Sequence, residues 1–288
     1  MNSKRRPLVF HKMHSLGNDF MVIEAVTQSV ALEPDQIARW GDRNTGIGFD
    51  QLLVIEAPTS AEADFWYRVY NCDGSSAEQC GNGTRAVALL ARTLDLSKKS
   101  ELIWQSAAGM ICTQFESEQR IVSNMTVPVL VLPDIPFDPT HAQDVTQGRV
   151  AQFQLAADDE LFTVTPISMG NPHAVLFVDD LFDIDVATLG AKLTSHPAYP
   201  EGANIGFCQV VDRQFLRLRV YERGTGETRA CGSGACAAMV AAHLHDKVDQ
   251  RVKVSLPGGK LRISWLDPQS PVTMSGAATL VFRGELQI

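Results

Sequence analysis

Short apolar runs bounded by turn-forming residues occur along the whole chain and predict many short β-strands. In the first half such runs occupy residues 51–55 and 65–70, and in the second half residues 162–167 and 215–220. They are rich in β-branched and aromatic residues, which pack well on a pleated surface. Further strands are expected at residues 10–15, 20–26, 102–104, 110–115, 121–127, 174–178 and 207–211, and in the tail from residue 253.

Two longer segments have apolar residues at helical spacing, and each follows a Cys-Gly-x-Gly sequence. The first, with apolar positions from Val87 to Leu94, predicts a helix of roughly four turns. The second, Ala235–His245, is almost wholly small and apolar. Because a helix that is apolar all round is normally buried, we expect this one to run through the middle of its half. Shorter helices are expected at residues 32–40 and 186–193.

One stretch of the chain occurs twice. When residues 68–92 are placed on residues 219–243 without a gap, 231 − 80 = 151 positions apart, several identities coincide. The shared residues are Arg-Val-Tyr at 68–70 and 219–221, Cys80 and Cys231, Gly81 and Gly232, Gly83 and Gly234, and Ala86 and Ala237. Weaker matches join Gly17-Asn18 to Gly170-Asn171 and Ile47-Gly48-Phe49 to Ile205-Gly206-Phe207. The repeat is far longer than a solenoid unit, so it predicts two homologous halves.

The two halves predict an α+β protein with two pseudo-symmetric domains. Each domain is expected to be a curved mixed or antiparallel sheet wrapped around its central helix, since the many prolines and short strands argue against a doubly wound parallel sheet. The N-terminal domain is expected to comprise residues 1–127 with 274–288, and the C-terminal domain residues 128–273. The proline-rich segment 128–139 is the best candidate for a linker. Polar loops are expected at residues 41–50, 71–79 and 203–206.

The composition is that of a globular protein and narrows the classes of partner. Hydrophobic residues make up 45% of the 288 residues and charged residues 20%, which are ordinary proportions. The net charge of −8 does not favour binding to nucleic acid. The only basic cluster, Lys4-Arg5-Arg6, is expected to be a solvated terminus. No signal-peptide core follows this cluster, and no apolar run reaches the ~18 residues of a membrane span. We therefore expect a cytoplasmic protein with no nucleic-acid or membrane partner.

The six cysteines are expected to be reduced, because a chain of this length without a secretory signal does not suggest a disulfide framework. There is no Cys-x-x-Cys sequence, and the cysteines have no His at ligand spacing, so no metal is expected. Four of the cysteines are expected to be small apolar fillers, namely Cys72, Cys112, Cys208 and Cys236. Cys80 and Cys231 differ from these because each stands in the duplicated glycine setting.

A cysteine directly before a helix lies where unpaired backbone N–H groups favour negative charge. The thiol pKa of Cys80 and Cys231 is therefore expected to fall from about 8.5 toward neutrality. The neighbouring glycines would let a ligand carboxylate approach the same N–H groups. Two such corners facing each other across an interdomain cleft would suit removal of a proton from a carbon next to a carboxylate, and its return on the other face. The alternative is that both cysteines only pack the helices and that the glycines only form turns.

Six blocks of sequence, taken together, resemble the diaminopimelate epimerase family over essentially the whole chain. The blocks are Leu16-Gly17-Asn18-Asp19-Phe20, Gly48-Phe49-Asp50-Gln51, residues 71–85 (NCDGSSAEQCGNGTR), Gly170-Asn171-Pro172-His173, Asn204-Ile205-Gly206-Phe207 and residues 221–234 (YERGTGETRACGSG). The resemblance implies an isomerase of lysine and peptidoglycan-precursor synthesis that interconverts LL- and meso-2,6-diaminopimelate without pyridoxal phosphate or another cofactor. The sequence agrees on one point, because Gly81-Asn82-Gly83 lacks the third glycine and later acid of a dinucleotide-binding turn.

The resemblance also implies roles for individual residues. Cys80 and Cys231 would be the catalytic acid–base pair, and Glu222 and His173 would tune the site. The substrate-binding positions would be Asn18, Gln51, Asn71, Gly81, Asn82, Asn171, Asn204, Glu222, Arg223, Gly232 and Ser233. Arg223 suits the distal carboxylate, because a guanidinium can bind it with two hydrogen bonds. Taken singly, the asparagines could be turn formers, His173 a surface residue, and Glu222 with Arg223 an exposed pair of little energetic value.

Two departures from the family pattern concern regions outside these residues. The segment 136–148 between the halves is longer than expected, and we expect it to alter a loop and not the site. Phe282 stands where the family often has a tyrosine linked to dimer contacts, so a homodimer remains the expected assembly.

Two other functions remain open from the sequence. A proline or hydroxyproline racemase also uses two cysteines, but Arg223 and the asparagines suit a second amino-acid head group, which proline lacks. A non-catalytic protein that binds amino acids, or a redox protein in which Cys80 and Cys231 form a disulfide, belongs to another class. Replacing either cysteine in such a protein would leave ligand binding intact.

Overall fold

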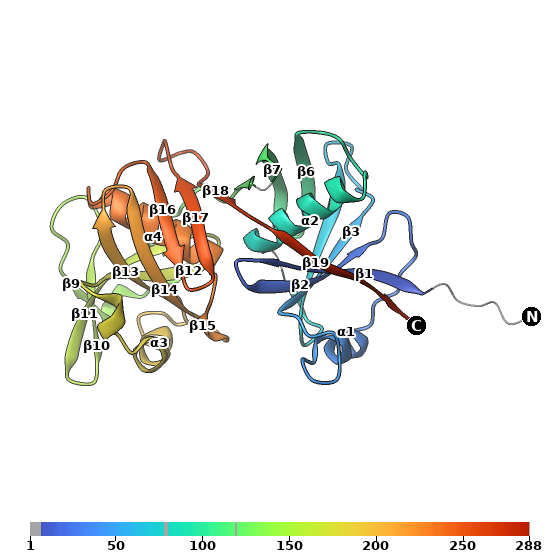
Figure 1. The fold of residues 1–288 in the computed structure, drawn as a ribbon. Helices are drawn as coiled ribbons and strands as arrows, with labels where there is room; N and C mark the ends of the chain where they lie inside the picture. Colours follow the sequence, from blue (N-terminus) through green and yellow to red (C-terminus); the bar gives the residue numbers. More distant parts are fainter. Residues whose placement is uncertain (1–6, 78–79, 119, 288) are drawn as a thin grey trace, which may run out of the picture. The chain divides into compact units, whose positions relative to one another are not determined.

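The computed structural model describes residues 7–77, 80–118 and 120–287, and it forms an α+β fold, as expected (Figure 1). The chain divides into two compact units: the first comprises residues 1–123 and 276–288, and the second residues 124–275. The boundaries expected from the sequence lie within four residues of these (127 − 123 = 4 and 276 − 274 = 2). Lys4-Arg5-Arg6, Glu78, Gln79 and the last residue of the expected tail lie outside the described residues.

The first unit is built on one twisted sheet in which most neighbouring strands are antiparallel. Strand β19 pairs with β1, and the order continues through β2, β3 and β4. The far side of β4 then pairs with β5 at one end and β6 at the other, and β7 and β8 follow. Only the β2–β3 and β4–β6 pairs are parallel among these pairs of the described residues. The strands are β1 Leu8–Ser15, β2 Asn18–Glu24, β3 Gln51–Glu56, β4 Phe65–Asn71, β5 Ser76–Ala77, β6 Glu101–Ser106, β7 Gly109–Ser117, β8 Arg120–Asn124 and β19 Thr279–Leu286.

The second unit repeats this order of strands. Its sheet runs from β10 through β11, β12 and β13 to β14, which pairs with β15 at one end and β16 at the other, and β17 and β18 follow. The β12–β13 and β14–β16 pairs are parallel, as are their counterparts in the first unit. The strands are β9 Gln143–Asp144, β10 Phe153–Ala157, β11 Glu160–Ser168, β12 Pro172–Phe177, β13 Asn204–Asp212, β14 Phe215–Glu222, β15 Gly226–Thr228, β16 Arg251–Leu256, β17 Gly259–Ser264 and β18 Thr273–Gly276.

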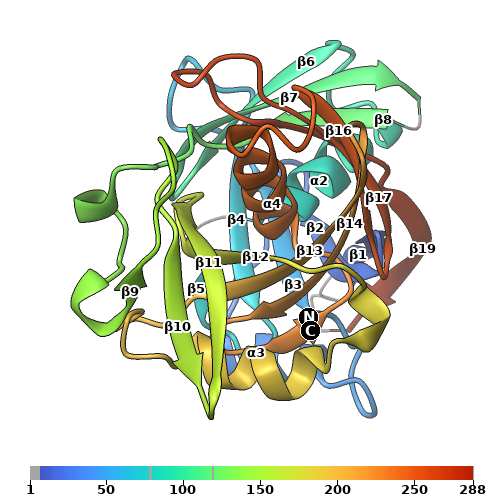
Figure 2. The ribbon, with the colours of Figure 1, turned by 90° about the vertical axis from the view of Figure 1, so that its left-hand side faces the viewer.

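Each unit contains one long buried helix, and the two helices occupy equivalent positions in the repeat. Helices α2, Gly81–Thr93, and α4, Gly232–Leu244, each have 13 residues and begin 232 − 81 = 151 positions apart. Helix α4 contacts β11, β12, β13, β14, β16 and β17, and Figure 2 shows these strands around it. Every residue from Gly234 to Ala242 is buried. The expectation that this apolar helix is buried in its half is therefore confirmed.

The remaining helical segments of the described residues are short, and some of their side chains, such as Ile37, Val186 and Leu193, are buried in the cores. They are α1 Pro34–Gly41, α3 Val186–Thr194 and three single 3₁₀ turns, Leu132–Asp134, Pro139–His141 and Leu181–Asp183. The helices expected at residues 32–40 and 186–193 are thus confirmed to within two residues at either end. In the described part of the chain, no helix is long and apolar enough to cross a membrane.

Two expectations about local structure were wrong. The segment 128–139 is not a free linker, because Ile135 and Phe137 are buried in the core of the second unit, where the Phe137 ring lies 4.8 Å from that of Phe153. The loop expected at residues 203–206 instead begins the central strand β13, in which Asn204 pairs with His173 of β12. Asn and Gly signal turns in an isolated sequence, but here tertiary strand pairing overrides that preference.

Candidate active site

The two duplicated cysteines each occupy the N-cap position of the long helix of their unit. Cys80 and Cys231 both have an extended backbone, and the side chain turns back onto the first helical turn. The Sγ of Cys80 accepts the N–H of Gly83 at 3.3 Å, and that of Cys231 accepts the N–H of Gly234 at 3.4 Å. These N–H groups have no partner within the helix, so a capping side chain satisfies them. The expectation of one cysteine at each helix start is confirmed.

A glycine as the third residue lets the start of each helix pack closely on the sheet. A Cβ at Gly83 would lie 2.3 Å from the hydroxyl of Tyr67, and one at Gly234 would lie 3.0 Å from Val220 Cγ2. Tyr67 also donates a hydrogen bond to the carbonyl of Cys80 at 3.1 Å. These two glycines therefore allow close packing that fixes the cysteines relative to strands β4 and β14.

Two asparagines lie beside Cys80, and both are positions that the family resemblance implies for substrate binding. Asn18 begins β2, and Asn82 lies in the first turn of α2. Asn18 Oδ1 lies 3.8 Å from Cys80 Sγ and accepts a hydrogen bond from Asn82 Nδ2 at 3.3 Å. The structure thus brings three of the predicted site residues of the first unit together.

Gln51 and Asn71 form a second pair at the same end of the first sheet. Gln51 begins β3 and Asn71 ends β4, and the two residues are paired in register. Gln51 Nε2 lies 3.4 Å from Asn71 Oδ1, and Asn71 Nδ2 donates to Ser75 Oγ at 3.0 Å. Because Gln51 also pairs with Phe20 of β2, this pair lies close to Asn18 along the neighbouring strand.

Cys231 has a different environment from the one that the sequence predicts. Its side chain is almost completely buried, and burial raises its pKa well above the ordinary value. The charge of Glu222 raises it further, while the N–H of Gly234 and the hydroxyl of Ser233, 3.7 Å from the sulfur, act in the opposite direction. The expectation that both thiols titrate near neutrality is wrong for Cys231, which carries its proton at neutral pH.

A threonine that the sequence did not single out holds Glu222. Thr228 in β15 donates its hydroxyl to the Glu222 carboxylate at the end of β14. Strands β14 and β15 pair so that Glu222 lies opposite Gly226, which places Thr228 on the adjoining strand. In the sequence YERGTGET, Glu222 and Thr228 are six residues apart, a spacing typical of a tight hairpin. This spacing was the signal in the sequence that could have indicated their contact.

The other predicted residues of the second unit lie at the start of the parallel β12–β13 pair. Asn171 Oδ1 lies 3.1 Å from His173 Nε2, and Asn204 Oδ1 accepts the backbone N–H of Arg223 at 2.9 Å. Burial, with a smaller effect of the Arg223 charge, lowers the pKa of His173 to about 3. His173 is therefore a neutral, buried ring and not a surface residue. The Arg223 side chain is exposed and donates one hydrogen bond to the carbonyl of Glu201 at 2.8 Å.

Two charged residues beside Cys80 were not predicted as part of the site. Arg85 lies on α2 and bonds Asn82, and Asp50 lies just before β3 and bonds Asn18. Both residues lie inside blocks of sequence that resemble the epimerase family, so the resemblance could have indicated that they belong to the site. Periodicity alone assigns Arg85 to a helix face and Asp50 to a loop, and says nothing of their contacts.

The polar groups of each unit suit acid–base chemistry. All six cysteines are free thiols. Within residues 7–77, 80–118 and 120–287, no group of three or more His, Cys, Asp and Glu residues is placed to hold a metal ion. Each unit presents one thiol at a helix N-terminus, where backbone N–H groups can bind a carboxylate.

Sequence relatives cover nearly the whole chain. The sequence model of the family described as diaminopimelate epimerase matches residues 10–131 and 165–281. Diaminopimelate epimerases of Pseudomonas syringae pv. tomato and Pseudomonas entomophila are 46% and 44% identical over 281 residues, which are 98% of this chain and 99% of each relative. The Cys80 and Cys231 motifs both fall inside the matched residues.

Solved structures with the same fold are more distant in sequence. A hydroxyproline epimerase from Agrobacterium vitis, with bound trans-4-hydroxy-L-proline, matches with a TM-score of 0.67 at 13% identity over 99% of this chain and 93% of that one. A Bacillus anthracis phenazine biosynthesis protein of the PhzF family matches with a TM-score of 0.65 at 15% identity over 98% of this chain and 100% of that one. At such identities the likeness concerns the fold alone. The match over both duplicated halves and the identity over almost the full length show that this chain belongs to the diaminopimelate epimerase family.

Proposed function

We propose that this protein is a diaminopimelate epimerase, an isomerase that interconverts LL- and meso-2,6-diaminopimelate with Cys80 and Cys231 as its acid and base and without a cofactor. The observation that carries the proposal is the pair of thiols at the N-caps of α2 and α4, each accepting a backbone N–H. Membership of the family, with relatives above 40% identity over the full length, supports the substrate.

The proposed reaction moves one proton off the Cα and another onto it. One cysteine, as thiolate, takes the Cα proton; the C–H bond breaks and an S–H bond forms. The electron pair left on carbon is delocalised into the adjacent carboxylate, which backbone N–H groups at a helix N-terminus stabilise. The other cysteine, as thiol, gives its proton to the opposite face of the same carbon. Cys231, which carries its proton at neutral pH, is suited to this second role when Cys80 is the base.

In the reverse direction the two cysteines exchange roles, and Cys231 must lose its proton first. The Glu222 charge opposes this loss. An ammonium group of the substrate placed beside Glu222 would offset that charge and favour the Cys231 thiolate. This role for Glu222 fits its fixed position against Thr228.

The predicted polar residues are assigned to the two ends of the substrate. Gly81, Asn82, Gly232 and Ser233 would hold the carboxylate at the reacting carbon. The exposed guanidinium of Arg223 would bind the distal carboxylate, and the side chains that complete the set are Asn18, Gln51, Asn71, Asn171 and Asn204. His173 would hold Asn171 in one orientation through the contact at 3.1 Å.

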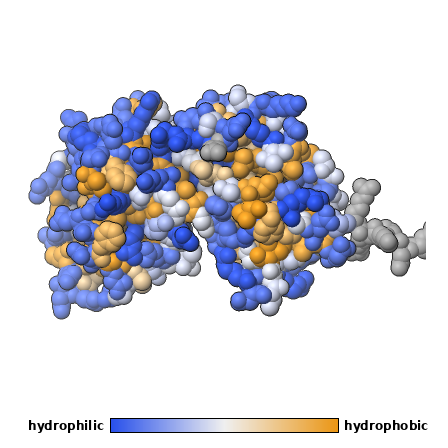
Figure 3. Space-filling view, viewed as in Figure 1, coloured by the Kyte–Doolittle hydropathy of each residue, from blue (hydrophilic) through white to orange (hydrophobic). Residues whose placement is uncertain are grey.

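The proposal includes a cytoplasmic homodimer. Hydrophobic residues gather on the surface of the first unit over β1 and β19 (Figure 3). In β19, Val281 and Phe282 are 54% and 47% exposed, and the Phe282 ring packs edge-on against Phe10. Burial of this face in a dimer would remove it from water. Six free thiols are typical of a protein from a reducing compartment.

Proton exchange followed by NMR tests the proposed reaction. Purified protein with reductant, LL-diaminopimelate and heavy water, without added cofactor, is expected to lose the Cα–H signal while the meso isomer accumulates. Cys80→Ser and Cys231→Ser should each lower the turnover rate by about 10²- to 10⁴-fold, the contribution of a positioned acid or base. Cys72→Ser, at an exposed cysteine, is the control and should retain full activity.

The same experiment separates the rival functions. Exchange of free proline without exchange of diaminopimelate would identify a racemase of the kind that shares this fold. No exchange with any amino acid, with ligand binding unchanged in both cysteine variants, would identify a binding or redox protein.

A further inference from the structure

Four polar side chains of the first unit form a single line of hydrogen bonds that passes Cys80. Arg85 Nη2 donates to Asn82 Oδ1 at 2.6 Å, and Asn82 Nδ2 donates to Asn18 Oδ1 at 3.3 Å. Asn18 Nδ2 donates in turn to Asp50 Oδ2 at 2.8 Å. Every donor in this line, which we call the Arg85–Asp50 relay, points toward Asp50.

The charges at the two ends determine the direction of the relay. A guanidinium can only donate hydrogen bonds and a carboxylate can only accept them, whereas an asparagine amide can turn over and exchange its oxygen with its nitrogen. If Asn18 turned over, its nitrogen would face the nitrogen of Asn82 and its oxygen would face the carboxylate of Asp50. Both contacts would be lost. Arg85 and Asp50 together therefore leave one favourable orientation for the two amides.

The Arg85 end of the relay is rigid. The side chain of Arg85 is completely buried. Its Nη1 donates to the carbonyl of Gly81 at 3.1 Å, and its Nη2 also donates to Ser15 Oγ at 2.8 Å. Ser15 in turn donates to the carbonyl of Ala277 at 2.8 Å. A buried cation that donates to Gly81 and Asn82 of α2 and to Ser15 of β1 cannot turn away without leaving polar groups unsatisfied.

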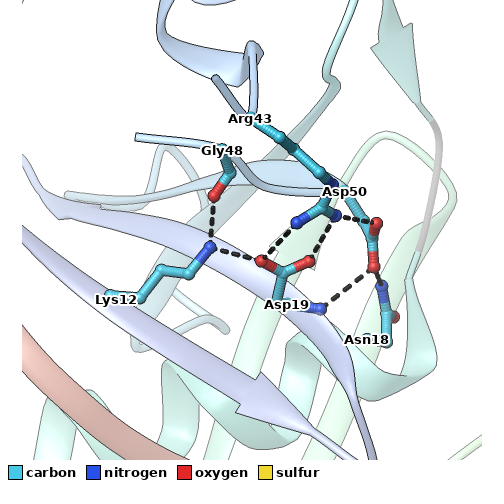
Figure 4. A network of polar contacts seen from close by, with 6 residues as sticks. All are labelled: Lys12, Asn18, Asp19, Arg43, Gly48 and Asp50. Atoms are coloured by element: carbon cyan, nitrogen blue, oxygen red, sulfur yellow. Dashed lines mark hydrogen bonds and ion pairs between the residues drawn. The ribbon is translucent and has the colours of Figure 1, made fainter. Parts of the chain in front are cut away.

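The Asp50 end is held by an ionic cluster (Figure 4). Arg43 Nη2 binds Asp50 Oδ1 at 2.6 Å and Asp19 Oδ1 at 2.8 Å. Burial alone would raise the pKa of Asp19, but hydrogen bonds from Arg43 and Lys12 lower it to about 2. Asp19 therefore stays charged at neutral pH and keeps Arg43 beside Asp50. The backbone N–H of Asp19 also donates to Asp50 Oδ2 at 3.1 Å.

The orientation set by the relay decides which atom faces the thiol. Asn18 Oδ1 lies 3.8 Å from Cys80 Sγ, so the amide offers the sulfur an acceptor and keeps its donors on Asp50. The second unit has no such relay, because the positions equivalent to Asn82 and Arg85 are Ser233 and Cys236 (82 + 151 = 233 and 85 + 151 = 236).

We propose that Arg85 and Asp50 are positioning residues of the Cys80 half of the site, which act through Asn82 and Asn18 and touch neither substrate nor sulfur. The inference rests on the proposed function for its catalytic consequence. Its structural content, one fixed orientation of Asn18 against Cys80, can be measured without turnover.

Asp50→Asn is the principal test, because Asp50 is half exposed and its replacement spares the core. The new amide can donate as well as accept, so the constraint at the Asp50 end is removed and only the Asn82 contact still opposes turning of Asn18. A larger fraction of Asn18 is then expected to present its NH₂ group to Cys80. A donor stabilises the thiolate. The rate of iodoacetamide alkylation at Cys80, measured by mass spectrometry at one pH, is expected to rise by roughly threefold to tenfold, the range that one hydrogen bond supplies. Epimerase turnover should fall by about 10- to 100-fold, as is usual for a lost outer partner of a site.

Asp249→Asn is a matched control. Asp249 also pairs with one arginine, Arg213, and its side chain is 41% exposed against 43% for Asp50. It lies in the second unit and bonds no predicted site residue, so neither readout should change. Asp50→Glu keeps an acceptor-only group and is expected to restore at least half of the activity.

The Asn18→Ala background separates positioning from a direct effect of charge. If Asp50 acts through Asn18, adding Asp50→Asn to Asn18→Ala leaves both the alkylation rate and the turnover of the single variant unchanged. An undiminished effect of Asp50→Asn in that background overturns the proposal, as does an Asp50→Asn variant indistinguishable from Asp249→Asn. Wild-type protein that does not epimerise diaminopimelate overturns the proposed function, while the alkylation of Cys80 still tests the relay. Arg85→Lys tests the Arg85 end of the relay. If this buried replacement prevents folding, the Asp50 variants alone decide whether the relay orients Asn18.

Discussion

The two cysteines occupy equivalent caps but have different electrostatic surroundings. Glu222 places a carboxylate near Cys231, and the residue at the equivalent position of the first half is the neutral Asn71 (71 + 151 = 222). In the first half, by contrast, the buried charge next to the helix start is the cation of Arg85. A duplicated backbone thus carries opposite charges in its two copies. Opposite charges favour different protonation states of the two thiols, as the proposed mechanism with one acid and one base requires.

Replacing Glu222 by Gln is expected to lower the pKa of Cys231. The carboxylate raises that pKa through its charge and its hydrogen bonding, so removing the charge favours the thiolate. Burial remains in the variant, and the pKa should therefore stay above the ordinary thiol value while lying below that of the wild type. Titration of the ¹³Cβ resonance of Cys231, assigned by its loss in Cys231→Ser, measures the shift and needs no reagent to reach the buried sulfur.

Glu227→Gln serves as the control for this titration. The Glu227 carboxylate is bound by Arg219 at 2.7 Å, so its replacement removes a nearby charge without touching the Glu222–Cys231 pair. Equal titration midpoints in Glu222→Gln and the wild type would show that Glu222 does not control the thiol.

The position of each cysteine could be predicted from sequence, but the state of its thiol could not. A cysteine followed by glycines and a helix is a local pattern, and N-capping depends only on the neighbouring turn. The pKa of Cys231 depends on burial in the folded protein and on the carboxylate of Glu222 at the end of β14. The Asn18–Asp50 contact likewise joins residues 32 positions apart. Such distant contacts leave no periodic signal in the chain.

At the scale of elements, the start of helix α2 is fixed by one close contact with the sheet. Gly83 faces Tyr67 of β4, whose hydroxyl donates to the carbonyl of Cys80. The Tyr67 side chain is fully buried and has little room to move. The contact therefore fixes the position of Cys80 relative to β4.

Gly83→Ala is expected to destabilise the protein and displace Cys80. The added methyl would lie 2.3 Å from the Tyr67 hydroxyl and 3.1 Å from Leu53 Cδ1, so the helix start or the tyrosine must shift. Overpacking of this kind costs about 1–3 kcal/mol of the free energy of unfolding. Urea denaturation measures the loss, and the exchange assay should show a fall in turnover in the fraction that remains folded.

Gly206→Ala, at a buried glycine of strand β13, is the control for the stability of Gly83→Ala. There the nearest atom to an added Cβ is Leu218 Cδ1 at 3.5 Å, an ordinary contact. A denaturation midpoint for Gly83→Ala as high as that of Gly206→Ala would contradict the importance of the Tyr67 contact.

The sequence predicted most of the strands and helices, and the failures share one cause. Periodicity located both long helices and the alternating strands because their apolar residues face a single core. It failed at residues 203–206, where a polar stretch lies in a central parallel strand, and at 128–139, where prolines coexist with buried Ile135 and Phe137. In both places the conformation depends on residues far away in the chain, and local composition indicates only a turn.

On the scale of the whole molecule, the path of the chain makes the two units unequal. The second unit is one continuous segment, residues 124–275, whereas the first needs its C-terminal residues 276–288. These residues supply β19, which pairs with β1 along almost its full length. Ala278 and Leu280 pack against the core of the first unit, and the carbonyl of Ala277 binds Ser15. Without β19, strand β1 would become an exposed edge beside an incomplete core.

The two units are therefore expected to differ as isolated fragments. Residues 124–275 should fold alone, with dispersed amide resonances and a cooperative thermal transition, because the fragment keeps its own sheet, its buried helix α4 and its core. Residues 1–123 should aggregate or remain unfolded. Since Leu286 pairs with Leu8, residues 276–288 placed ahead of residue 7 through a short flexible linker would form a β19–β1 hairpin, and this permuted first unit should fold. Native-like spectra for residues 1–123 without β19 would show that the returning strand is dispensable. A permuted unit that stays unfolded would show that the first unit cannot fold without the second, even when β19 is supplied.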